Sequence, residues 1–229
     1  MTGEALRLIS AGALAVVLSS ALSVDALAQT VGTCDSQVRI AGNIEIDLAT
    51  PGEYVDVCQK DRELCKSLTS GYPASVSTLA YFVTPNEWAT FLEKQTGFSE
   101  YLIAQLSHGM APEQLPGFKA YVRSQNGTVP DNTELHKLLA DRGRVSLGVV
   151  DESPNSISFG VVLKVQDAVG TMNLASINSA IVIRDRVLSL YAFQQVSTVD
   201  RTEPLRARSG RWLACLNKQN SPPPKARVK

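Results

Sequence analysis

Apolar residues gather in several stretches of this chain, at alternate positions in one and as continuous runs in the others, and each stretch predicts a β-strand. Residues 38–48 alternate in this way and are interrupted by Gly42-Asn43, which predicts a strand or a hairpin. Residues 101–106 fit a strand or a helix, and we interpret them as a strand. Further apolar runs that predict strands cover residues 54–57, 76–83, 145–150, 157–165 and 177–193, the last split into a hairpin by Arg184-Asp185-Arg186.

Helical signals separate these runs. Thr84 is a predicted helix N-cap with Pro85 at the first helical position, and Glu87 completes a capping box. This helix is expected to bury an apolar stripe made of Trp88, Phe91 and Leu92. A second helix is predicted at residues 133–142, where Gly143 is the stop and one face carries Leu135, Leu138 and Leu139.

The last predicted helix is expected to dock on the sheet. Its apolar stripe at helical spacing consists of Leu205, Trp212, Leu213 and Leu216. Residues 107–132 instead form a broken region that contains three glycines together with Pro112, Pro116 and Pro130. Because proline and glycine interrupt regular structure, we expect at most one short helix there, at residues 118–124.

Strands joined mainly by hairpins, with helices early, in the middle and at the end, indicate an α+β fold in which helices pack on the faces of an antiparallel β-sheet. The hairpin of residues 179–193 has a charged turn and an aromatic end, and Asp200 and Trp212-Leu-Ala-Cys-Leu-Asn217 follow it. This C-terminal third resembles exported bacterial proteins of the Mog1/PsbP-like family. The resemblance implies an α/β/α sandwich, an accessory or binding role without known catalysis, and residues 107–132 as an insertion.

The N-terminus predicts export from the cytoplasm. Arg7 precedes an apolar run at residues 8–22, and Ala26-Leu27-Ala28 places small residues where a signal peptidase cuts, before Gln29. No later stretch approaches the ~20 apolar residues of a transmembrane helix. We therefore expect a periplasmic or secreted protein with a signal peptide at residues 1–28, a single domain at 29–219 and a disordered basic tail at 220–229.

All four cysteines lie in the exported part, where disulfide bonds persist. Four cysteines allow three pairings. We prefer Cys58 with Cys65, which closes a short polar loop, and this choice leaves Cys34 with Cys215. A structural zinc site is disfavoured because the chain has no closely spaced cysteine pair with a histidine nearby. We expect neither a metal nor a cofactor.

Charge is balanced over the whole chain, with 22 basic and 22 acidic residues, which gives no indication of a nucleic-acid partner. The segment from residue 200 onward is locally basic, with eight basic residues against two acidic ones. It provides a candidate binding surface for an anionic membrane or an acidic envelope protein, made of Arg206, Arg208, Arg211, Lys225, Arg227 and Lys229. The alternative is a solvated helix face followed by a solubilising tail.

Catalytic signatures are sparse. Neither the G-x-S-x-G elbow of serine hydrolases nor a Ser-x-x-Lys motif occurs in the sequence. His108 lies beside turn-forming residues, where a loop can present an imidazole as a base or simply expose a surface histidine. The sequence favours an exported, non-enzymatic accessory or binding protein of the bacterial envelope. The alternative is a hydrolase of unrecognised type whose site is built from the 107–132 loop.

Overall fold

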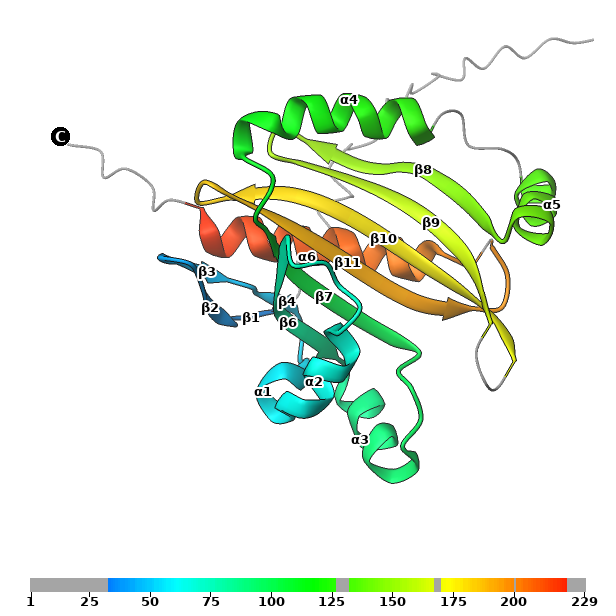
Figure 1. The fold of residues 1–229 in the computed structure, drawn as a ribbon, viewed down its shortest axis with the longest axis horizontal. Helices are drawn as coiled ribbons and strands as arrows, with labels where there is room; N and C mark the ends of the chain where they lie inside the picture. Colours follow the sequence, from blue (N-terminus) through cyan, green and yellow to red (C-terminus); the bar gives the residue numbers. More distant parts are fainter. Residues whose placement is uncertain (1–32, 127–131, 167–169, 200, 222–229) are drawn as a thin grey trace, which may run out of the picture. The chain divides into compact units, whose positions relative to one another are not determined.

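A seven-stranded antiparallel sheet forms the centre of the structure (Figure 1). The computed structural model describes residues 33–126, 132–166, 170–199 and 201–221, all within one compact unit. The predicted signal peptide and residues 222–229 lie outside the described ranges. In spatial order the strands are β5 (Val55–Asp56), β6 (Val76–Val83), β7 (Glu100–Ser107), β11 (Arg186–Val196), β10 (Thr171–Ile183), β9 (Ser156–Gln166) and β8 (Arg144–Ser153). The fold is α+β, as the sequence predicts.

Two short two-stranded sheets accompany the large one. The alternation at residues 38–48 forms the hairpin of β2 (Val38–Ala41) and β3 (Ile44–Asp47), and Gly42 occupies its turn with a φ of 69°. That backbone conformation favours glycine because it has no Cβ. The other pair joins β1 (Cys34–Asp35) to β4 (Thr50–Pro51).

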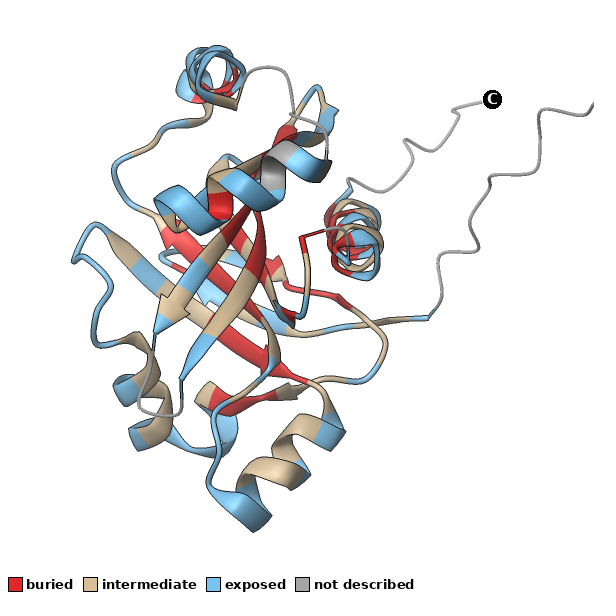
Figure 2. Cartoon of the chain, turned by 90° about the vertical axis from the view of Figure 1, so that its right-hand side faces the viewer, coloured by how far each residue is buried: buried red, intermediate tan, exposed pale blue. Residues whose placement is uncertain are grey.

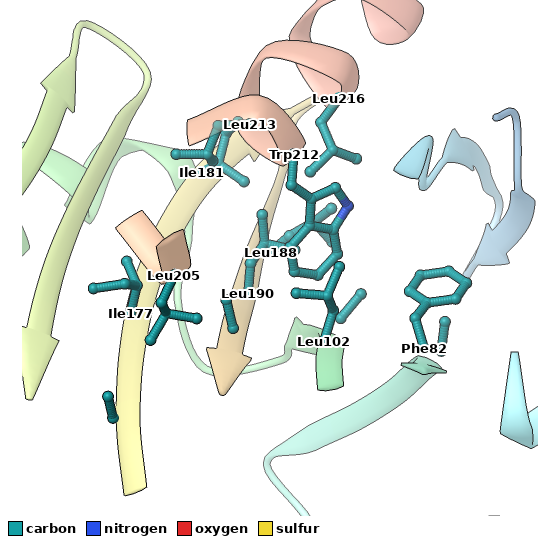
Figure 3. Close-up of a cluster of buried hydrophobic side chains, with 14 of the residues drawn as sticks. Phe82, Leu102, Ile177, Ile181, Leu188, Leu190, Leu205, Trp212, Leu213 and Leu216 are labelled. Atoms are coloured by element: carbon teal, nitrogen blue, oxygen red, sulfur yellow. The ribbon is translucent and has the colours of Figure 1, made fainter. Parts of the chain in front are cut away.

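The C-terminal helix α6 (Glu203–Asn220) covers one face of the large sheet and forms the main core with it. The predicted stripe is confirmed, because all four of its members are buried: Leu205, Trp212, Leu213 and Leu216. Trp212 is 1% exposed, and its ring and that of Phe82 form a T-shaped pair with a centroid distance of 6.4 Å. Figure 3 shows Trp212 extending from α6 towards the sheet, with Leu188, Leu190 and Leu102 below it.

The opposite face of the sheet is covered only near its two ends (Figures 1 and 2). At one end, α4 (Leu115–Asn126) packs on β8 and β9 through residues that include Leu115 and Val122. At the other end, residues of three short helices pack against Tyr81, Val83 and Ile103. These helices are α1 (Val57–Lys60), α2 (Arg62–Thr69) and α3 (Pro85–Lys94). The remaining helices are η1 (Pro112–Gln114) and α5 (Asn132–Arg142).

Helix α3 begins where the sequence predicts, but its apolar stripe is not buried. The hydroxyl of Thr84 accepts the N-cap hydrogen bond from the backbone of Glu87. Trp88 and Phe91 are only half-buried, and Leu92 is 58% exposed. The reason is that α3 lies at the border of the sheet and not over its centre. Trp88 and Phe91 stack on each other there.

The broken region contains a longer helix than the sequence predicts. Helix α4 has twelve residues and starts before Pro116 and Gly117. A proline is tolerated in the first turn because the N–H it lacks would have no partner within the helix. The segment between Cys58 and Cys65 is also mainly helical, since Asp56 caps α1 and Asp61 caps α2. The expected polar loop is therefore wrong.

Asn220 belongs to the domain and not to the tail that we expected to begin there. It is the last residue of α6 and is 9% exposed. Its side-chain oxygen accepts from the backbone N–H of Asp47 at 3.0 Å, and its side-chain nitrogen donates to the carbonyl of the same residue at 2.7 Å. The side-chain amide of Asn220 bonds to both backbone groups of Asp47 in β3, as the backbone of a neighbouring strand would. These two hydrogen bonds hold the end of α6 at this residue.

Candidate functional site

The arginines of α6 do not form one free basic surface. Arg208 is half-buried and makes an ion pair with Glu100 of β7 at 2.6 Å. Arg206 is also half-buried, whereas Arg211 is exposed. Helical spacing directs Arg208 towards the sheet, where a carboxylate already neutralises it. The predicted basic binding surface stays a prediction: Arg208 already has a carboxylate partner, and Lys225, Arg227 and Lys229 lie outside the described residues.

The cysteines form two disulfide bonds with the pairing that the sequence spacing favours. Cys34 and Cys215 join β1 to α6 with an S–S distance of 2.08 Å. Cys58 and Cys65 join α1 to α2 with an S–S distance of 2.05 Å. Within the described ranges, no cluster of three or more His, Cys, Asp or Glu side chains has the arrangement of a metal site.

His108 follows the end of β7 and contacts a hydroxyl. Its Nε2 lies 2.7 Å from Oγ of Ser77 on β6, and its backbone N–H donates to the carbonyl of Ser75 at 2.9 Å. Both His108 and Ser77 are exposed. A hydroxyl that donates to Nε2 leaves the proton of a neutral imidazole on Nδ1, so this contact can fix the orientation and tautomer of the ring.

His108 also lines a cavity of about 380 Å³, which we call the His108 pocket. Its walls come from the turn between β2 and β3, the end of β7 with the loop after it, and the turn between β10 and β11. The apolar lining residues are Ala41, Gly42, Leu106, Met110, Ala111, Pro112 and Val187, and the polar ones are Ser107, His108, Asp185 and Arg186.

The turn between β10 and β11 brings two charged side chains to this pocket. Arg184 and Asp185 form its centre, with φ angles of 48° and 61°, and β11 starts at Arg186. Hydrogen bonds fix the turn to the β2–β3 hairpin. Arg184 donates to the carbonyl of Glu45 at 2.7 Å, and Arg186 donates to the side-chain oxygen of Asn43 at 3.1 Å. These contacts close one side of the pocket.

A second candidate site is the stretch of sheet between α4 and the group of α1, α2 and α3, where Figure 1 shows no helix in front of the strands. We call it the open face. The strand registers place on this side of the sheet Thr78, Tyr81, Tyr101, Ile103, Gln105, Phe159, Val161, Ser176, Asn178, Ser189, Tyr191 and Phe193. Tyr81 and Ile103 lie at its border, where the short helices bury them, and Phe159 lies at the other border beside α4; Gln105, Val161 and Ser176 are also buried. These residues are apolar, aromatic or neutral polar, so the open face carries no charged side chain at these positions.

Four stacked rings cross the open face over three strands. Tyr81 and Tyr101 stack at 5.0 Å, and Tyr101 and Phe193 stack at 4.7 Å. Phe193 is followed by Tyr191, whose ring is 6.2 Å away and nearly parallel. We call these four residues the aromatic row. Tyr101, Tyr191 and Phe193 are half-buried and thus reach the solvent.

Within the row, the hydroxyls of Tyr81 and Tyr101 stay protonated over the physiological pH range. Burial raises the pKa of Tyr101 to about 12, and it raises the pKa of Tyr81 further. Burial and the neighbouring Tyr191 also raise the pKa of Tyr72, which precedes β6. A protonated phenol both donates and accepts hydrogen bonds, so this end of the open face offers neutral polar groups beside aromatic surface.

Sequence reasoning identified His108 but missed Ser77, the charged turn as a pocket wall, and the aromatic row. Tyr191 and Phe193 are two positions apart in one strand, which places them on the same face. This spacing is the one feature of the sequence that could have indicated an aromatic face. The contact of Tyr101 with Phe193 needs the pairing of β7 with β11, which are not neighbours in the sequence.

Comparisons with known proteins give little further information. No protein-family model and no curated protein sequence matches the chain. Among solved structures, it is similar to the Ran-binding protein Mog1p of Saccharomyces cerevisiae, with 12% identity and a TM-score of 0.38 over 82% of this chain and 95% of that one. A likeness this distant assigns no partner and no residue. No helix in the described residues is long and apolar enough to span a membrane.

Proposed function

We propose that this protein is an exported, non-enzymatic binding protein of the bacterial envelope and that it holds a protein partner against its open face. The observation that carries the proposal is the aromatic row, in which Tyr101, Tyr191 and Phe193 are half-buried, among strand positions without charged side chains. The export component rests on the residue pattern before Gln29 and on the compartment that disulfide bonds require.

The composition of the open face is that of an interface core. The centres of protein interfaces are depleted of charged residues and enriched in tyrosine and phenylalanine. Tyrosine adds large contact area for a small loss of side-chain entropy. In the aromatic row the loss of side-chain entropy on binding is smaller still, because each ring is already held against a neighbouring ring before a partner binds. The open face is therefore preorganised for binding.

The basic C-terminal surface is the weaker candidate. Arg208 already has its partner in Glu100, so an anionic membrane would meet mainly Arg211, Lys218 and the tail. Binding of this kind weakens as salt screens charge over about 8 to 10 Å. If the protein binds acidic vesicles, and a variant with a substitution in the open face binds them equally well, the result would contradict a role centred on the open face.

The test is capture from an envelope extract by the mature protein and by two variants. Tyr191→Arg places a charge in the aromatic row, whereas Tyr121→Arg makes the same change on α4 at a residue that is 60% exposed. A specific protein should be retained by the parent and by Tyr121→Arg, and retention should fall about tenfold or more with Tyr191→Arg. Equal retention by both variants, or retention of no protein, would overturn the proposal.

The contact of His108 with Ser77 favours a second candidate function, the hydrolysis of an ester. A serine with a histidine at 2.7 Å has the elements of a nucleophile and its base. Ser77 is not among the lining residues of the pocket, however, and this is why we place binding first. If the pair is catalytic, a fluorophosphonate should label Ser77, and Ser77→Ala and His108→Gln should both abolish hydrolysis of p-nitrophenyl acetate. No labelling of Ser77 would exclude this function.

A further inference from the structure

The His108 pocket has the dimensions and the two kinds of wall of a small-molecule site. Its volume of about 380 Å³ lies in the usual range for such sites, roughly 300 to 1,000 Å³. One part of the wall is apolar and includes Leu106, Met110 and Val187. Another part carries two side chains of opposite charge that are neighbours in the sequence, Asp185 and Arg186.

Arg186 is suited to bind a carboxylate. It is half-buried, and in the described part of the chain its hydrogen bond goes to the neutral amide of Asn43 through one guanidinium nitrogen. A guanidinium presents several N–H donors in a planar fork that matches the two oxygens of a carboxylate. Arg186 therefore retains donors for a ligand in the pocket that it lines.

Asp185 restricts the choice of ligand. Its exposed carboxylate stands at the same wall, where it would repel a simple anion and attract a cation. A ligand with both charges is attracted by both residues.

We infer that the His108 pocket binds a free α-amino acid with an apolar side chain. The α-carboxylate pairs with Arg186, the α-ammonium group pairs with Asp185, and the side chain packs against Leu106, Met110 and Val187. His108 and Ser107 supply additional hydrogen-bonding groups at the same wall. This inference is independent of the proposed function, because none of the residues of the aromatic row lines the pocket.

The first test is calorimetric titration of the mature protein with three probes that differ in charge. L-leucine carries both charges, L-leucinol lacks the carboxylate, and 4-methylpentanoate lacks the ammonium group. Leucine should bind, and each of the others should bind about tenfold more weakly or worse, because one charged hydrogen-bonded partner is missing. Equal binding of the three probes, or no binding of leucine at millimolar concentration, would overturn the inference.

The second test uses variants that keep the fold. Asp185→Asn removes the charge, and asparagine suits a positive φ, so the turn should stay intact. Arg186→Gln removes the guanidinium. Both variants should weaken leucine binding by about tenfold or more, whereas Asp151→Asn and Arg142→Gln, at exposed positions outside the pocket, should not change it. Unchanged binding in Asp185→Asn and Arg186→Gln would contradict the assignment of the two charges even if leucine binds elsewhere.

Discussion

Asn220 should contribute more to stability than its place near the C-terminus suggests. Its amide accepts from the N–H of Asp47 and donates to the carbonyls of Asp47 and Leu216, the last at 2.9 Å. The amide thereby attaches the end of α6 to β3. In Asn220→Ala all three hydrogen bonds are lost, and the N–H and carbonyl of Asp47 lose this partner.

The magnitude follows from these bonds. A hydrogen bond within a protein contributes about 1 kcal/mol net, and a polar group left without a partner costs more as it becomes less accessible to water. Asp47 is half-buried, so water compensates in part. We therefore expect Asn220→Ala to lower the free energy of unfolding by about 2 to 3 kcal/mol.

Urea denaturation followed by circular dichroism measures this loss, with Gln219→Ala as the matched control. Gln219 is the preceding residue and is exposed, so its truncation should change the free energy of unfolding by less than about 0.5 kcal/mol. A chain that ends after Ser221 should match the full chain, whereas one that ends after Gln219 should lose as much as Asn220→Ala. Equal stability of Asn220→Ala and Gln219→Ala would refute the reasoning.

Four further predictions concern the scaffold. Trp212→Ala should lower the free energy of unfolding by about 3 to 5 kcal/mol in the same urea assay, because it removes a buried aromatic ring; a loss below about 1 kcal/mol would mean that α6 does not depend on this residue. The unreduced mature protein should be four hydrogens lighter than the reduced protein by mass spectrometry, because it contains two disulfide bonds. Breaking the Cys34–Cys215 bond by double alanine substitution should cost about 5 kcal/mol, against about 2.5 for Cys58–Cys65, because the longer loop restrains the unfolded chain more; a reversed order would contradict the chain-entropy explanation. Since burial raises the pKa of Tyr101 to about 12, the stability that its protonated form contributes should be complete below about pH 10 and be lost as the pH rises towards 12. Urea titrations at several alkaline pH values should show this loss, and Tyr101→Phe should reduce it.

Local patterns in the sequence predict most of the elements of this fold. The apolar run at residues 76–83 corresponds to β6, and the apolar stripe with Trp212 corresponds to the buried side of α6. The capping box at Thr84 marks the start of α3. These predictions succeed because strand alternation, helix periodicity and caps depend on residues that are close in the sequence.

The functional surfaces depend on contacts that local patterns do not contain. The aromatic row requires β7 to lie beside β11, so that Tyr101 faces Phe193. The pocket requires the turn with Asp185 to lie on the β2–β3 hairpin through Asn43 and Glu45. The prediction that the apolar stripe of α3 is buried is wrong because burial also depends on contacts distant in the sequence. An amphipathic pattern does not show how much of the sheet is available to cover the stripe.

The most direct test of the central claim is photocrosslinking at the open face in the producing cell. A photoreactive p-benzoyl-phenylalanine replaces Tyr191 in one variant and Tyr121 in the other, and both keep an aromatic ring at the altered position. We predict that the probe at 191 forms a crosslink to a specific envelope protein and that the probe at 121, on the outer side of α4, does not. Crosslinks at 121 with none at 191 would contradict binding through the open face.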